Sequence, residues 1–149
     1  MRVSFQRDFP VPAATLWPWL TDPARMQWSA APVELLSAGP CGQPDGVGSR
    51  RLVRVGIGPL RSSLIEEIVQ SQPPQHFVYR VLSGGGLRQH EGTIDIEAVD
   101  QHCRMRWVVE YQTWVPGLGF PLKWLLQQQL GRSLQILHEL LEAEAAGAG

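Results

Sequence analysis

The chain has 149 residues, of which 44% are hydrophobic and 18% are charged, and its formal net charge is −1. This length and composition fit one folded domain over residues 1–149 and exclude an intrinsically disordered chain. The balanced charge gives no electrostatic reason to expect binding to nucleic acid or to an anionic membrane, and no apolar run approaches the roughly 20 residues of a membrane-spanning helix.

The N-terminus and the cysteine content indicate a cytoplasmic protein. The chain enters a strand-like pattern at its first residues, without the features of a signal peptide. Cys41 and Cys103 are too few for a disulfide framework, and no Cys-x-x-Cys motif occurs. The abundance of Pro, Gly, Arg and Trp is typical of a GC-rich bacterial genome. A homodimer is compatible with the sequence, which does not give the oligomeric state.

The first part of the chain predicts one strand and two short helices. Residues 2–9 alternate between apolar and polar side chains, which is typical of a strand. Pro12 can open a helix, and Pro18 is expected to kink or end that helix because it removes a backbone donor. Asp22 is a suitable N-cap for a second short helix that runs to about Trp28.

Strand-like runs separated by turn residues follow. They are Val33–Ser37, Ser49–Val55, Leu60–Ser71, His76–Leu82, Leu87–Ala98 and Cys103–Thr113. Glycines at 84–86 predict a tight hairpin between two of them. The last strand alternates most clearly, so that one face is buried and the other is wet, as an antiparallel sheet permits.

Leucines spaced by three and four then predict one amphipathic helix from Pro121 to about residue 144, followed by a fraying Ala/Gly tail. The order of elements therefore predicts an α+β domain. About seven antiparallel strands form a curved sheet around a long C-terminal helix, with two short helices after the first strand.

Several local motifs accompany this order. They are Trp17-Pro-Trp-Leu-Thr-Asp-Pro23 followed by Trp28-Ser29, Gly46-Val-Gly-Ser-Arg-Arg51, Pro73-Pro-Gln-His-Phe-Val-Tyr-Arg80 and His90-x-Gly92-x-Ile94-x-Ile96. Together they resemble the helix-grip superfamily of START lipid-transfer domains, the birch-pollen-allergen fold and polyketide cyclase/dehydrase-like proteins. The resemblance implies an apolar cavity under the C-terminal helix, no required cofactor and no single catalytic set. Pro18 departs from the usual pattern of the first helix.

Polar residues that share a face with apolar ones indicate the site. In the run 87–98, His90 and Arg88 have the parity of Ile94, so both are expected to point to the concave side. His90 then either contacts a ligand or is a hydrogen-bonded histidine of the core or its rim.

In the run 60–71, either Glu66 or Glu67 must be buried, and the resemblance favours Glu66. A buried carboxylate must be paired or protonated, so Glu66 is expected either to pair with Arg88 or Arg51 or to act in catalysis. Apart from that pairing, Arg50, Arg51 and Arg54 are expected to be solvated strand residues.

Aromatic and sulfur-containing side chains of inward parity form the expected wall of the cavity. They are Tyr79, Met105, Trp107 and Tyr111. Trp107 is expected to be buried and to face the C-terminal helix. No Gly-x-Ser-x-Gly motif and no pairing of histidines for metal binding occur, so we expect no metal site and assign no catalytic residue.

Three hypotheses follow. The leading one is a binding or carrier protein for a small hydrophobic molecule with an apolar body and one polar end, oriented by Glu66, His90 and Arg88. The second is an enzyme such as a polyketide aromatase/cyclase, with Glu66, His90 or Tyr79 as acid/base. The third is an interaction module with a filled core. A pocket smaller than roughly 300 Å³ would favour the third, and a water-filled pocket with convergent Glu, His and Tyr would favour the second.

Overall fold

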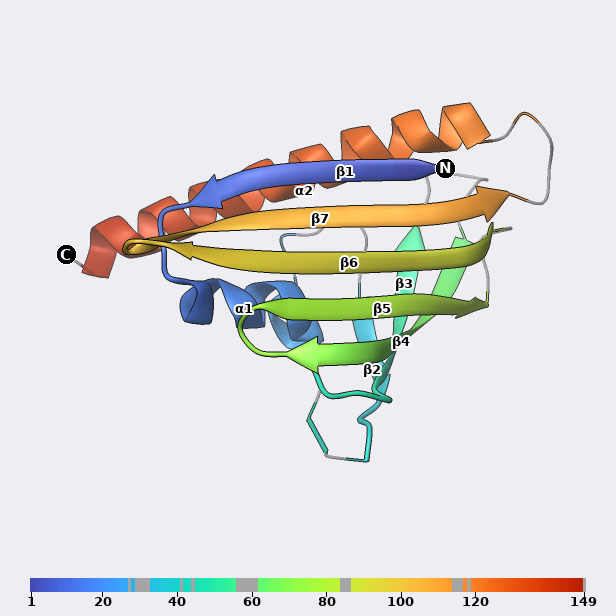
Figure 1. Cartoon of the computed structure of the whole chain (residues 1–149), viewed down its shortest axis with the longest axis horizontal. Coiled ribbons are helices and arrows are strands. Elements are labelled where there is room, and N and C mark those ends of the chain that lie inside the picture. The colour runs from blue at the N-terminus through green and yellow to red at the C-terminus, as the bar shows by residue number, and fades with distance from the viewer. Residues whose placement is uncertain are drawn as a thin grey trace.

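One antiparallel sheet and a long helix beside it form the framework of the protein (Figure 1). The computed structural model describes residues 1–26, 28, 33–40, 42–43, 45–55, 62–83, 87–113, 117 and 119–148. The sheet has seven strands in the order β1-β7-β6-β5-β4-β3-β2. The strands are β1 (Arg2–Phe9), β2 (Val33–Ser37), β3 (Arg50–Val55), β4 (Ser62–Gln72), β5 (His76–Ser83), β6 (Leu87–Val99) and β7 (His102–Thr113). The helices are α1 (Ala13–Thr21), the 3-10 helix η1 (Pro23–Arg25) and α2 (Gly119–Ala148).

This arrangement confirms the predicted α+β helix-grip class. All neighbouring strands pair antiparallel. Strand β1 is one edge of the sheet, where it pairs with β7 and Phe5 lies opposite Trp107. Figure 1 shows the sheet curving, so that β2 and β3 run nearly across the direction of β1 and β7, while α2 runs alongside β1. The predicted hairpin glycines at 84–86 and the first residues of the run 60–71 lie outside the described residues.

The short helices differ from the prediction at their ends. Helix α1 does not end at Pro18 but continues to Thr21, because Leu16 and Leu20 on either side of the proline are buried in the core and this packing offsets the lost backbone hydrogen bond. Asp22 caps η1 as predicted, since its Oδ1 accepts a hydrogen bond from the Ala24 amide at 3.0 Å. The 3-10 helix ends at Arg25 and does not reach Trp28.

Helix α2 is longer at both ends than the prediction. It starts at Gly119, so that Pro121 lies in the first turn, where backbone amides have no intrahelical partner. It continues to Ala148 because the tail is rich in alanine and glutamate, which are good helix formers. Within the described residues, no helix has the length and apolar character needed to cross a bilayer.

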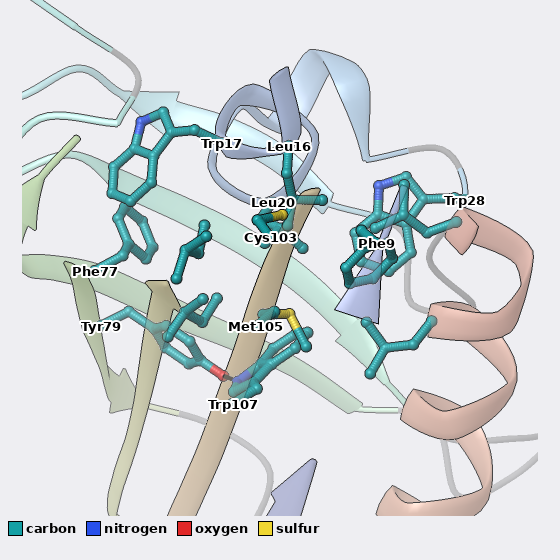
Figure 2. Packing of buried hydrophobic residues seen from close by; sticks show 14 of the residues in the cluster. Phe9, Leu16, Trp17, Leu20, Trp28, Phe77, Tyr79, Cys103, Met105 and Trp107 are labelled. Atoms are coloured by element: carbon teal, nitrogen blue, oxygen red, sulfur yellow. Dashed lines mark hydrogen bonds between the residues drawn. The ribbon is translucent and has the colours of Figure 1, made fainter. Parts of the chain in front are cut away.

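The core lies between the concave face of the sheet, α1 and the second half of α2. Figure 2 shows α1 side chains such as Leu16 and Trp17 pointing toward side chains of the sheet, with Trp17 above Phe77. The Trp17 and Phe77 rings meet edge to face with centroids 5.6 Å apart. Leu134, Leu137 and Leu141 of α2 complete the core, which leaves the first half of α2 to cover the rest of the concave face.

Candidate functional site

A cavity of about 100 Å³ lies between the sheet and the first half of α2. Most of its wall is apolar and comes from β3 to β7, while α2 contributes Leu126, Gln129, Leu130 and Ser133. Leu20, Met26 and Val33 line it on the side of α1, η1 and β2. Arg51, Glu66, Tyr79 and His90 supply its ionisable side chains from four neighbouring strands.

Strand alternation brings Arg51 and Glu66 to the cavity. On β3, Arg51 has the parity of Val53, and on β4, Glu66 has the parity of Leu64. The two are cross-strand partners, so both project from one face of the sheet. Glu67 lies on the other face, where its carboxylate pairs with Arg50 at 3.0 Å and with Arg80 at 3.4 Å. Glu66 is therefore the inward glutamate.

The burial of Arg51 corrects the expectation that it is solvated like Arg50 and Arg54. Its side chain is 2% exposed, because it shares the inner face with Val53. Its Nη2 donates to the Thr21 carbonyl at 2.9 Å, its Nη1 contacts the Met26 sulfur at 3.6 Å, and its guanidinium lies 5.5 Å from the centre of the Phe77 ring. Arg51 thus ties β3 to the end of α1 and holds a positive charge at the cavity.

Burial dominates the protonation of the Glu66 carboxyl. It raises the pKa of Glu66 to about 7, although the Arg51 charge acts in the opposite direction. The same burial lowers the pKa of Arg51, and the Glu66 carboxylate opposes that change. Glu66 is therefore the cavity group that can exchange a proton near neutral pH.

Tyr79 and Trp107 form a hydrogen-bonded pair on the sheet side of the cavity. The Trp107 Nε1–H donates to the Tyr79 hydroxyl oxygen at 3.2 Å, and Figure 2 shows the two side chains meeting at these atoms. Burial, followed by the Glu66 charge, raises the pKa of Tyr79, which keeps the phenol protonated. Trp107 is 7% exposed and lies in the wall that α2 covers, so the prediction that it is buried is confirmed.

Gly92 makes this pair sterically feasible. Gly92 is the cross-strand partner of Tyr79, and a Cβ at position 92 would lie 2.1 Å from Tyr79 Cζ. The tyrosine ring therefore crosses β6 over a residue that has no side chain. This close approach directs the ring from β5 toward Trp107 on β7.

His90 is a buried and electrically neutral polar group in the cavity wall. It is 6% exposed, and its Nδ1 has no hydrogen-bond partner among the described residues. Its ring lies between those of Tyr79 and Tyr111, with centroids 6.5 Å and 6.2 Å away. Burial lowers the pKa of His90 to about 4, so the imidazole is uncharged at neutral pH.

The structure brings together part of the predicted site. Glu66, Tyr79, His90 and Trp107 all line the cavity. Met105 and Tyr111 point inward but are 0% and 1% exposed in the packed core, and they do not line the cavity.

The side chain of Arg88 lies outside the described residues, but the backbone around it affects the parity argument. The pairing of β6 with β7 shifts between Arg88 and Glu91, and Gln89 has a φ of 53°. A shift of this kind inserts an extra residue into β6 and interrupts the alternation of the strand. That Arg88 points to the concave side therefore stays a prediction.

Arg51, Gln129 and Ser133 line the cavity but were not among the predicted site residues. The alternation of Arg51 with Val53 could have indicated that Arg51 faces the cavity. The sequence around Gln129 and Ser133 in α2 gives no comparable indication. No group of three or more His, Cys, Asp or Glu side chains in the described part of the chain could hold a metal ion.

Comparison with known proteins gives the family. Residues 1–142 match the family model for polyketide cyclase/dehydrase and lipid transport. Comparison with functionally curated proteins finds no match.

Solved structures share the fold at low sequence identity. A START superfamily protein from Mycobacterium smegmatis has a TM-score of 0.79 at 16% identity, covering 95% of this chain and 97% of its own. A protein from Thermus thermophilus has a TM-score of 0.77 at 16% identity, covering 97% and 99%. A norcoclaurine synthase point mutant from Thalictrum, in complex with a transition-state analogue, has a TM-score of 0.70 at 14% identity, covering 97% and 96%. The chain therefore belongs to the polyketide cyclase/dehydrase and lipid-transport family and has the START-like helix-grip fold.

Proposed function

We propose that the protein binds or carries a small hydrophobic molecule, of the lipid, polyketide or isoprenoid kind, in the cavity between the sheet and α2. One observation carries the proposal: a mostly apolar cavity has the half-buried Glu66 and the buried His90 in its wall. A buried polar group costs free energy unless something polar meets it, and a ligand with an apolar body and a polar end would do so.

The size of the cavity sets a condition on the ligand. At about 100 Å³ it has room for several water molecules but is smaller than the roughly 300 Å³ of typical small-molecule sites. By volume alone, the filled-core interaction module is favoured, whereas the ionisable groups of the wall favour a ligand. A larger ligand requires part of the wall to move, and the first half of α2 is the part that suits this, because none of its described side chains is fully buried.

An acid–base enzyme is the second candidate function, and the convergence of Glu66, His90 and Tyr79 on one cavity favours it. With a pKa of about 7, Glu66 can accept or donate a proton at neutral pH. His90 and Tyr79 would then serve as uncharged hydrogen-bonding groups, since burial lowers the pKa of the first and raises that of the second.

Calorimetric titration with toluene and with hexylbenzene tests binding, and native mass spectrometry of freshly purified protein tests for a co-purified molecule. We expect saturable binding of both hydrocarbons, with hexylbenzene requiring displacement of α2. Leu130→Trp fills the cavity from α2 and should abolish binding. Leu140→Trp is the matched control, because Leu140 is 45% exposed on the same helix and does not line the cavity.

The outcomes separate the hypotheses. A well-folded protein that binds neither hydrocarbon would exclude the carrier function and leave the interaction module. If a co-purified molecule is identified, Glu66→Gln distinguishes carrier from enzyme. A carrier shows no turnover of the molecule in either form, whereas the enzyme converts the molecule only when Glu66 is present.

A further inference from the structure

We propose that the cavity selects an uncharged ligand whose hydroxyl group hydrogen-bonds to His90. This inference rests on the proposed binding function and names the chemistry of the ligand's polar end. It starts from His90, a residue of the cavity wall whose buried Nδ1 has no hydrogen-bond partner among the described residues.

A hydroxyl group can hydrogen-bond to this histidine in either of its neutral tautomers. A neutral imidazole has one N–H donor and one nitrogen acceptor, and either can be at Nδ1. A hydroxyl group satisfies both tautomers, because it can donate to a bare nitrogen or accept from an N–H. The pKa of about 4 means that the protonated form, which a carboxylate would prefer, is scarce at neutral pH.

The charges of the cavity argue against an ionic ligand. Above pH 7, where Glu66 is mostly ionised, Glu66 and Arg51 are cross-strand partners of opposite charge and together leave the cavity without net charge. Glu66 would repel a carboxylate ligand, and Arg51 would repel an ammonium ligand. Arg51 also already donates to the Thr21 carbonyl and lies against Phe77. An added charge would therefore remain unbalanced in a buried site, which is costly.

Four ligands of matched shape test the inference at pH 8, where Glu66 is mostly ionised. They are toluene, p-cresol, p-toluate and 4-methylbenzylammonium. Calorimetry gives the affinities, and the Trp107 indole N–H resonance, assigned with Trp107→Phe, reports on the cavity wall. We expect p-cresol to bind roughly tenfold tighter than toluene, as one satisfied buried hydrogen bond allows, and both charged ligands to bind more weakly than toluene.

His90→Leu should remove the preference for p-cresol while toluene still binds. His138→Leu is the matched control. His138 also has a buried Nδ1 without a partner in the described part of the chain, but its Nε2 lies 2.7 Å from Glu142 on α2 and it does not line the cavity. This control should keep the order of affinities. If His90→Leu does not fold, the order of the four ligand affinities in the wild-type protein tests the inference by itself.

Several results would overturn the inference. Toluene binding as tightly as p-cresol would exclude hydroxyl selection but leave the proposed binding function intact. Tightest binding of p-toluate would make Arg51 the centre of an anion site. No binding of any of the four, with the protein folded, would reject the binding function itself.

Discussion

The two halves of α2 differ in how they meet the rest of the protein. In the C-terminal half, residues 133–148, Ser133, Leu134, Leu137 and Leu141 are at most 1% exposed. In the N-terminal half, residues 119–132, no described side chain is fully buried, and Phe120 and Trp124 are 76% and 62% exposed.

The same helix therefore has two roles. Its C-terminal half is attached to β1, where Arg7 donates to Gln135 Oε1 at 2.8 Å and the Phe9 ring lies 5.6 Å from that of His138. Its N-terminal half covers the cavity with side chains that are only partly buried, among them Leu126 and Leu130. A helix held at one end can open at the other without unfolding the domain, which is the property that a binding cavity needs.

The largest expected effect is a difference between the two halves of α2 in how much a leucine-to-alanine change lowers the free energy of unfolding. Leu137→Ala should lower the free energy of unfolding by about 2–5 kcal/mol, because it creates a cavity in a fully packed core. Leu126→Ala, the matched change in the N-terminal half, should cost less than half as much, since Leu126 is partly exposed and already borders a cavity. Urea denaturation measures both. Equal losses would mean that α2 is packed uniformly and that the comparison is wrong.

The second effect tests whether the N-terminal half keeps water away from Glu66. The pKa of Glu66 rises from 4.5 to about 7, so the folded protein retains this proton longer than the unfolded chain. The resulting loss of stability is absent below about pH 4.5, grows as the pH rises and is complete above about pH 7. Glu66→Gln stays neutral, so its stability relative to wild type should increase by about 1–3 kcal/mol between these limits.

Paired denaturation curves of wild type and Glu66→Gln across that pH range give the measurement, and the difference removes the titration of all other groups. Glu67→Gln on the opposite face is the control, and its curve should lack this rise with pH. A constant difference between wild type and Glu66→Gln would show that water reaches the carboxyl.

The smallest effect concerns the outer side of the N-terminal half. Trp124→Ser should change the free energy of unfolding by no more than about 0.5 kcal/mol, because the indole is mostly exposed. Thermal melts at fixed pH check this, with Trp107→Ser as the destabilised reference. A large loss for Trp124→Ser would indicate that the indole is covered in solution, for example by a second copy of the chain.

The framework of the fold could be predicted because it follows from local periodicity. Alternation located the strands to within one or two residues, and leucine spacing located α2. The difference between the halves of α2 could not be predicted, since leucines recur at the same spacing in both and burial depends on what lies opposite.

The observed cavity wall differs from the predicted site for several physical reasons. The register shift beside Gln89 interrupts the alternation of β6, and no residue type marks it. For Arg51, alternation with Val53 indicated the inner face, but an arginine in a strand is usually solvated, and its contact with Thr21 depends on tertiary structure. Met105 and Tyr111 have inward parity, yet parity cannot distinguish a packed interior from a cavity wall.

The contact between Tyr79 and Gly92 limits how this protein can acquire a new ligand preference. A smaller residue at position 79 would uncover the β6 backbone and leave Trp107 without its acceptor, whereas any larger residue at position 92 would push the ring aside. Neither position can change alone without disturbing the wall. Variation in ligand choice among descendants of this sequence should therefore arise first in the helix that covers the cavity, and in the sheet only through paired substitutions.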